Sequence, residues 1–149
     1  MSRSMNRIVF IADFFSDQVP GGGELNNEEL INILRGSGCK VEKKNCHFVD
    51  KDYIRKNSNS WFIVSNFVNL SEEVKLLLQD EKYVIYEHDH KFVKSRNPAL
   101  YENYQAPLSE IINFDFYKSA LAVVCQSKFH EEIVKKNLKL NNITNIGGN

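Results

Sequence analysis

The sequence predicts an α/β protein with a Rossmann-like three-layer αβα sandwich and a mainly parallel sheet. Short apolar runs rich in β-branched and aromatic residues alternate along the chain with segments of helical periodicity. Several of these runs are almost continuously apolar, which is typical of parallel strands covered on both faces. Strands that alternate with helices are joined by right-handed crossovers and therefore build a parallel sheet.

Six segments have the length and composition of strands. They comprise residues 7–12, 40–46, 61–65, 83–87, 121–125 and 142–146. The run Tyr83–Tyr86 is the most informative, because it is too tightly bounded for a helix and ends abruptly in ionisable residues. Open α/β sheets deliver polar groups in this way to a ligand crevice at the carboxyl ends of their strands. We therefore expect the functional site at that edge.

Helical periodicity and capping residues predict the intervening elements. We expect one helix over residues 24–35, one from the Asp50 cap to Lys56, one after the Ser71 cap, one beginning at Pro107 and one after the Ser127 cap. The helix at Pro107 would carry Leu108, Ile111 and Ile112 on its apolar side. The segment before it, residues 88–106, shows little regularity.

Length and composition limit the classes of protein. The chain has 149 residues, the size of one domain, so we expect a single domain over residues 1–149. Lys plus Arg and Asp plus Glu both number 19, so no net charge favours nucleic acid or an anionic membrane. No apolar stretch approaches the roughly 20 residues of a membrane span, and the polar amino terminus resembles no signal peptide. We expect a cytoplasmic protein that binds neither nucleic acid nor membrane.

A glycine turn, Gly21-Gly22-Gly23-Glu24, precedes the first helix. Three glycines let a ligand approach the backbone closely and leave free N–H groups at the positive end of the helix. The spacing matches neither the GxGxxG turn of NAD enzymes nor a P-loop. Glu24 would repel an adjacent phosphate and suits a sugar hydroxyl better. The turn is thus a candidate binding site, with a merely flexible turn as the alternative.

The residues that follow the strand 83–87 are candidates for catalysis. His88 and His90 are two apart, so on an extended backbone they point the same way and can share a ligand with Asp89 between them. They could act in acid–base or hydrogen-bonding roles. Two imidazoles and a carboxylate are also acceptable zinc ligands, but His47 and His130 lie in no recognisable ligand spacing to complete a site. Solvated loop charge is the third alternative.

Four further residues are weaker candidates for ligand binding. Glu87 ends the central strand, and Asn66 follows the strand 61–65. Arg96 is presented just beyond the sheet, where it could bind phosphate or carboxylate or instead pair with Glu87 or Asp89. Ser127 joins a strand to a helix, and capping alone would explain it.

The order of these motifs resembles a known family. Strand, loop, Gly21-Gly22-Gly23-Glu24 and helix are similar to the amino-terminal domain of GT-B retaining glycosyltransferases, the glycogen-synthase-like and sucrose-synthase-like group. Residues 86–98 and 116–130 are also similar to segments of some predicted members. The resemblance implies that residues 21–24 face the donor phosphates and the acceptor, and that His88, Asp89, His90 and Arg96 line the acceptor side. It implies neither a metal nor a cofactor, with a nucleotide-sugar as substrate.

The chain departs from that family in one respect. There, a second Rossmann-like domain with a Glu-x7-Glu signature holds most of the nucleotide-sugar, and this sequence ends at Ile146-Gly147-Gly148-Asn149, about where the linker would begin. We therefore expect an acceptor-side domain that is inactive alone and works with a carboxyl-terminal domain or a separate subunit. An apolar interdomain face, including Phe14, Phe15 or Tyr101, would favour self-association.

Two other classes of function remain open from the residues alone. One is a free-standing Rossmann-like module that binds a nucleotide or a protein without catalysis. The other is a metal-dependent hydrolase that uses residues 87–90.

Overall fold

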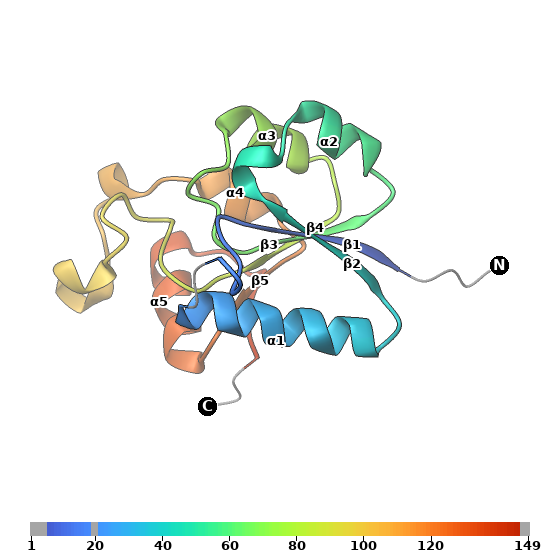
Figure 1. The fold of residues 1–149 in the computed structure, drawn as a ribbon. Helices are drawn as coiled ribbons and strands as arrows, with labels where there is room; N and C mark the ends of the chain where they lie inside the picture. The colour runs from blue at the N-terminus through green and yellow to red at the C-terminus, as the bar shows by residue number, and fades with distance from the viewer. Residues whose placement is uncertain (1–5, 19–20, 147–149) are drawn as a thin grey trace. The chain divides into compact units, whose positions relative to one another are not determined.

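The computed structural model describes residues 6–18 and 21–146 (Figure 1). The residues at which we place a linker, Gly147 to Asn149, lie outside this part of the chain. Contacts divide the chain into two compact units, Met1–Tyr83 and Val84–Asn149. The single domain that the length suggests stays a prediction.

The first unit contains three parallel strands in the order β2-β1-β3. They are β1 (Arg7–Ala12), β2 (Lys40–Asn45) and β3 (Trp61–Val64), with Arg7 opposite Lys40 and Ile8 opposite Trp61. The helix α1 (Gly22–Gly36) covers one face, while α2 (Lys51–Lys56) and α3 (Glu72–Leu78) cover the other (Figure 1). Because β1 is covered on both sides, it is apolar from Ile8 onward, and residues 9–12 are at most 1% exposed.

The second unit contains three more parallel strands in the order β4-β5-β6. They are β4 (Tyr83–Tyr86), which begins at the last residue of the first unit, β5 (Ala122–Cys125) and β6 (Ile143–Asn145). The helix α4 (Phe114–Ser119) precedes β5, and α5 (Lys128–Leu138) packs against β5 and β6. The Rossmann-like α/β fold with a parallel sheet flanked by helices is therefore confirmed.

Most elements lie where the sequence predicts them, but the helix at Pro107 is wrong. Residues Leu108–Glu110 form one 3-10 turn, and Ile111 instead makes an antiparallel bridge to Val93. Two backbone hydrogen bonds, from Ile112 N–H to the Phe92 carbonyl and from Lys94 N–H to the Glu110 carbonyl, hold this bridge. The backbone groups that a helix needs are therefore already engaged.

The segment before α4 is irregular, as expected, with 3-10 turns at Pro98–Leu100 and Glu102–Tyr104. Asn137 of α5 fastens it: the side-chain carbonyl accepts from Ala106 N–H at 2.8 Å, and the amide donates to the Tyr104 carbonyl at 2.8 Å.

Of the aromatic residues predicted to be exposed, Phe14 is 43% exposed but Phe15 is 3% exposed, so the expectation fails for Phe15. Phe15 turns inward to pack edge-on against Phe10. Among the described residues, no helix combines the length and apolar character needed to cross a membrane.

Asp13 fastens the loop after β1 to the loop after β3. Its carboxylate is 6% exposed and accepts from Val68 N–H and Asn69 N–H, both at 2.9 Å. A carboxylate satisfied by backbone donors stabilises both loops, since charge-assisted hydrogen bonds are the stronger kind.

The substitution Asp13→Asn replaces one acceptor oxygen by a donor that faces a backbone N–H. We expect it to lower the free energy of unfolding by about 1–3 kcal/mol, measured by urea denaturation. Asp17 lies exposed in the same loop, so Asp17→Asn is the matched control and should change stability by less than about 0.5 kcal/mol. Equal stability of D13N and the wild type would refute this role of Asp13.

Candidate functional site

The glycine turn lies at the carboxyl ends of the strands of the first unit. Gly21 precedes α1 with extended backbone angles (φ −86°, ψ 174°), and the helix begins at Gly22. One turn further on, Asn27 accepts a hydrogen bond from the hydroxyl of Ser65, the residue that follows β3, at 3.0 Å. This buried contact holds the amino end of α1 against the end of β3. A ligand crevice at this position stays a prediction.

The backbone of the turn does not require glycine. Neither Gly21 nor Gly22 has a positive φ. A Cβ on Gly22 would meet no atom within 4 Å, and one on Gly21 would meet only the flexible carboxylate of Glu24, 2.5 Å away. Glycine within a helix costs up to about 1 kcal/mol relative to alanine. Gly21 is the residue that caps the helix, a position glycine favours, so the fold alone leaves Gly22 unexplained.

Asn66 contributes its backbone to the same region. Its carbonyl accepts from Asp13 N–H at 2.8 Å and from the thiol of Cys46 at 3.3 Å, while its side chain is half-buried. These bonds fix the chain at the end of β3. A ligand contact of the Asn66 side chain stays a prediction.

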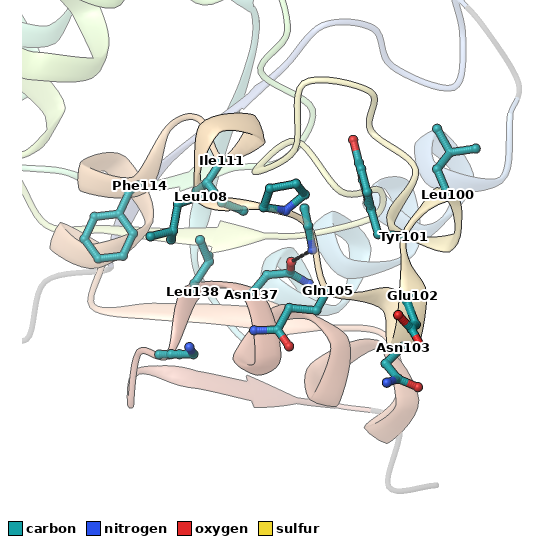
Figure 2. A pocket seen from close by; sticks show the side chains of 13 residues that line it. Leu100, Tyr101, Glu102, Asn103, Gln105, Leu108, Ile111, Phe114, Asn137 and Leu138 are labelled. Atoms are coloured by element: carbon teal, nitrogen blue, oxygen red, sulfur yellow. Dashed lines mark hydrogen bonds between the residues drawn. The ribbon is translucent and has the colours of Figure 1, made fainter.

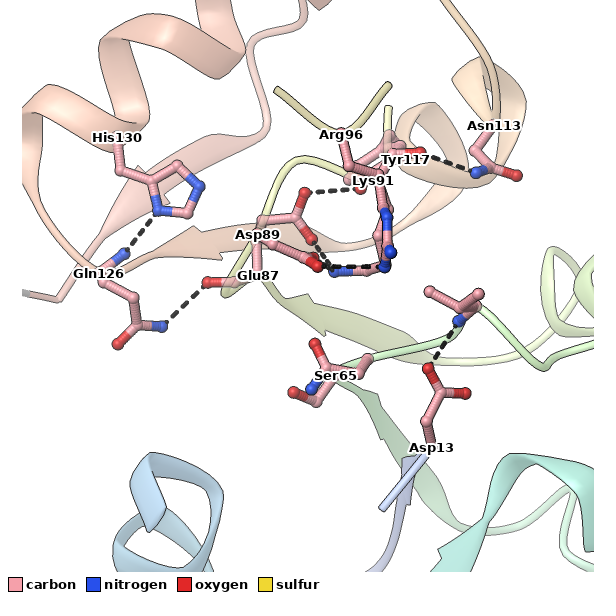
Figure 3. Close-up of polar contacts among 12 residues, drawn as sticks. Asp13, Ser65, Glu87, Asp89, Lys91, Arg96, Asn113, Tyr117, Gln126 and His130 are labelled. Carbon is pink, nitrogen blue, oxygen red and sulfur yellow. Dashed lines mark hydrogen bonds and ion pairs between the residues drawn. The ribbon is translucent and has the colours of Figure 1, made fainter. Parts of the chain in front are cut away.

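A buried network organises the polar residues of the second unit (Figure 3). Glu87 is fully buried directly after β4, and its carboxylate accepts from the Lys91 ammonium at 2.8 Å and from the Tyr117 hydroxyl at 2.6 Å. Lys91, 2% exposed, also donates to Asp89 at 2.6 Å. We call Glu87, Asp89, Lys91 and Tyr117 the strand-end network. Because Glu87 is fully buried, its role is to hold residues 87–91 in place through these hydrogen bonds.

Burial and the close ion pairs shift the pKa values of the groups in the strand-end network. Burial raises the pKa of Glu87, and Lys91 offsets this only in part. Burial alone would lower the pKa of Lys91, but Glu87 and Asp89 outweigh it and raise that pKa above its ordinary value. Burial would raise the pKa of Asp89, yet Lys91 and then Arg96 hold it below its ordinary value. Asp89, with its side chain 43% exposed, is thus an ionised carboxylate that reaches solvent.

The histidines beside the network are neutral. Burial, and then the nearby Lys91 charge, lowers the pKa of His88 to about 4. Burial also lowers the pKa of His90. Neutral imidazoles cannot neutralise a phosphate, but each offers one hydrogen-bond donor and one acceptor. This favours the hydrogen-bonding alternative for His88 and His90 near neutral pH.

His130 also belongs to this group, although it is not among the residues predicted from sequence. It lies in the first turn of α5, and its ring is 4.7 Å from the ring of His90, centroid to centroid. Burial, and then His90, lowers its pKa to about 4. The available signal was its position three residues after the predicted helix cap Ser127, on a helix that starts at the carboxyl end of a strand.

Ser127 and Arg96 make the structural contacts that the sequence analysis names as alternatives to ligand binding. The Ser127 hydroxyl caps α5 by accepting from His130 N–H at 3.1 Å. Arg96 has φ 57°, its side chain is 51% exposed, and it lies 3.6 Å from Asp89. An exposed pair at this distance contributes little to stability. The guanidinium therefore remains accessible to a ligand.

A cavity of about 820 Å³ lies elsewhere in the second unit (Figure 2). Residues of the irregular segment, from Leu100 to Phe114, and the carboxyl end of α5 line it. None of the catalytic or ligand-binding residues predicted from sequence lines it, although Tyr101 of the predicted apolar face does. Asn137, its most buried polar group, is already engaged by Tyr104 and Ala106. We therefore base the candidate site on the polar residues at the strand ends.

Comparison with known proteins adds no family: no protein-family model and no curated protein matches the chain significantly. In the part of the chain that the structure describes, no three His, Cys, Asp or Glu side chains are grouped so as to hold a metal ion. The candidate functional residues thus form two separate sets, one in each unit: the glycine turn in the first, and the strand-end network with its histidines in the second.

The substitution Tyr117→Phe tests the strand-end network. It leaves one oxygen of the buried Glu87 carboxylate without its 2.6 Å donor, so we expect the free energy of unfolding to fall by about 1–3 kcal/mol. Tyr101→Phe is the control, because the Tyr101 hydroxyl has only an exposed 3.4 Å contact with Ser95. Urea denaturation of both variants makes the comparison, and equal losses would contradict the assignment.

The lowered pKa of His130 predicts a pH dependence of stability. The unfolded chain binds a proton below the ordinary value of 6.5, whereas the folded chain does so only near 4. Stability contributed by His130 is therefore present above pH 6.5 and is lost as the pH falls from 6.5 to 4. At pH 5 the wild type should take up about one more proton on unfolding than His130→Phe, measured from denaturation midpoints against pH. Parallel pH profiles would exclude a depressed pKa.

Proposed function

We propose that this chain is the acceptor-side domain of a GT-B glycosyltransferase that transfers a hexosyl group from a nucleotide-sugar. In this proposal a second domain or subunit supplies most of the nucleotide contacts, and the chain alone is inactive. The glycine turn contacts the donor phosphates, while His88, Asp89, His90 and Arg96 contact the acceptor.

The glycine turn is the observation that carries the proposal. Helical N–H groups at the amino end of α1 form a positive end that favours a phosphate. The backbone does not need a glycine at position 22, and the missing side chain there leaves the approach to the helix end open. Glu24 lies over Gly21, so its carboxylate either swings aside for the phosphate or accepts a hydroxyl of the sugar.

The second unit supports the proposal through its choice of polar groups. Ionised Asp89 and neutral His88 and His90 suit the hydroxyl groups of an uncharged acceptor. In front-face transfer the bond from the anomeric carbon to the phosphate oxygen breaks as the acceptor oxygen attacks, and the acceptor proton passes to the departing phosphate. This route requires no imidazole base with a pKa near 7, and helix N–H groups stabilise the departing phosphate.

The alternative is a module that binds a nucleotide without transfer. The same glycine turn would accept a nucleoside diphosphate, and the acceptor residues would then have no role. Affinity for the sugar part of the donor separates the two functions.

The substitution Gly22→Ala tests the phosphate contact. A methyl group at this position meets no protein atom, so stability should be unchanged or rise by up to about 1 kcal/mol. It would project into the path of the ligand, so we expect binding of UDP-glucose or GDP-mannose to weaken at least about tenfold. Binding is measured by NMR chemical-shift titration, which detects the weak affinity of half a site.

Gly36→Ala is the matched control, because it lies in the same helix and its Cβ would likewise meet no atom within 4 Å. It should leave binding unchanged. Equal binding by G22A and G36A, or no binding of either nucleotide-sugar by the wild type, would refute the proposal. Equal affinity for UDP and UDP-glucose would favour the binding module.

A further inference from the structure

His90, which is half-buried, and His130, which is buried, contact each other in the second unit. Their rings are 4.7 Å apart at 71°, and Phe92 packs edge-on against His90 at 5.4 Å. The Ser127 cap fixes the backbone of His130, which is 9% exposed. The two rings come from segments about 40 residues apart, so the fold, and not local sequence, brings them together.

Each ring has one buried nitrogen without a hydrogen-bond partner. These atoms are Nδ1 of His90 and Nε2 of His130. Buried polar atoms nearly always have a partner, and leaving one unpaired costs about 1–3 kcal/mol. Because the two rings are in contact, a single further group that lies against both of them would complete both hydrogen bonds.

The chemistry of the rings selects that group. Nδ1 of His130 accepts from Gln126 N–H at 3.5 Å, which places the ring proton on Nε2 and makes that atom a donor. The charged neighbours are Lys91 and Asp89, with neutral His88 also nearby. Since both rings are neutral near pH 7, they offer no net charge to an anion. A hydroxyl both accepts and donates, so one hydroxyl satisfies both nitrogens.

We propose that His90 and His130 together bind one hydroxyl group of an uncharged sugar or polyol. The proposal adds His130 to the site as a residue that determines which hydroxyl is accepted. It rests on the proposed function in that the hydroxyl then belongs to the acceptor, but the binding itself requires no transfer.

The test is a titration of the full chain, with histidine labelled by ¹⁵N, against methyl α-D-glucopyranoside. Long-range proton–nitrogen spectra report each ring nitrogen of the four histidines. We expect saturable shifts of His90 Nδ1 and His130 Nε2 and none at His47, which is exposed in the first unit. Tetrahydropyran, which has the same ring without hydroxyls, should shift neither nitrogen.

The variant His130→Phe keeps the ring volume and removes both nitrogens, so we expect it to weaken binding about five- to tenfold. His47→Phe should bind as the wild type does. If H130F does not fold, the wild-type ring-nitrogen shifts decide by themselves. No saturable shift with the glucoside would mean that only an internal water occupies the pair and would overturn the proposal, as would equal shifts with tetrahydropyran.

This result is separable from the test of the glycine turn. Glucoside binding at His130 together with unchanged nucleotide-sugar binding by G22A would sustain the hydroxyl site and reject the glycosyltransferase. Weaker nucleotide-sugar binding by G22A without glucoside binding at His130 would sustain the transferase proposal and remove His130 from its site.

Discussion

Burial of the Lys91 ammonium between two carboxylates is the constraint on which the candidate site of the second unit depends. Lys91 lies 2.8 Å from Glu87 and 2.6 Å from Asp89, and it is almost wholly enclosed. Removing one partner of a buried ion pair costs about 3–5 kcal/mol, so the chain cannot open here cheaply. Residues 87–91 must therefore curl back at the end of β4. The curl presents His88, Asp89 and His90 around a fixed charge.

The buried Lys91 also places a charged carboxylate next to uncharged imidazoles within residues 88–90. Lys91 keeps Asp89 ionised, and the burial that encloses Lys91 keeps the histidines neutral. A ligand at this position would thus meet a carboxylate acceptor beside uncharged donors and acceptors. The glycine turn of the first unit offers a third kind, backbone N–H groups at a helix end. The first unit thus offers groups that suit a phosphate, and the second unit offers groups that suit hydroxyls.

Sequence patterns were sufficient to predict the strands, but they could not predict which side chains contact each other. The runs around Phe10, Phe62 and Ile85 were recognisable because parallel strands covered on both faces must be apolar. The helix expected at Pro107 fails because pairing of Ile111 with Val93, almost 20 residues away, takes its backbone groups. His130 was missed for a similar reason, since its contact with His90 exists only in three dimensions.

Arg96 occupies a position whose backbone conformation favours glycine. A non-glycine residue with φ 57° is uncommon, and a glycine could adopt this conformation without a steric penalty. A long cationic side chain nevertheless occupies the position, and its contact with Asp89 is too loose to justify it. The unfavourable backbone conformation of Arg96 therefore lowers the stability of the folded chain, and the contact with Asp89 does not offset this loss. An anionic ligand bound by the Arg96 guanidinium would offset part of this cost through its own binding free energy.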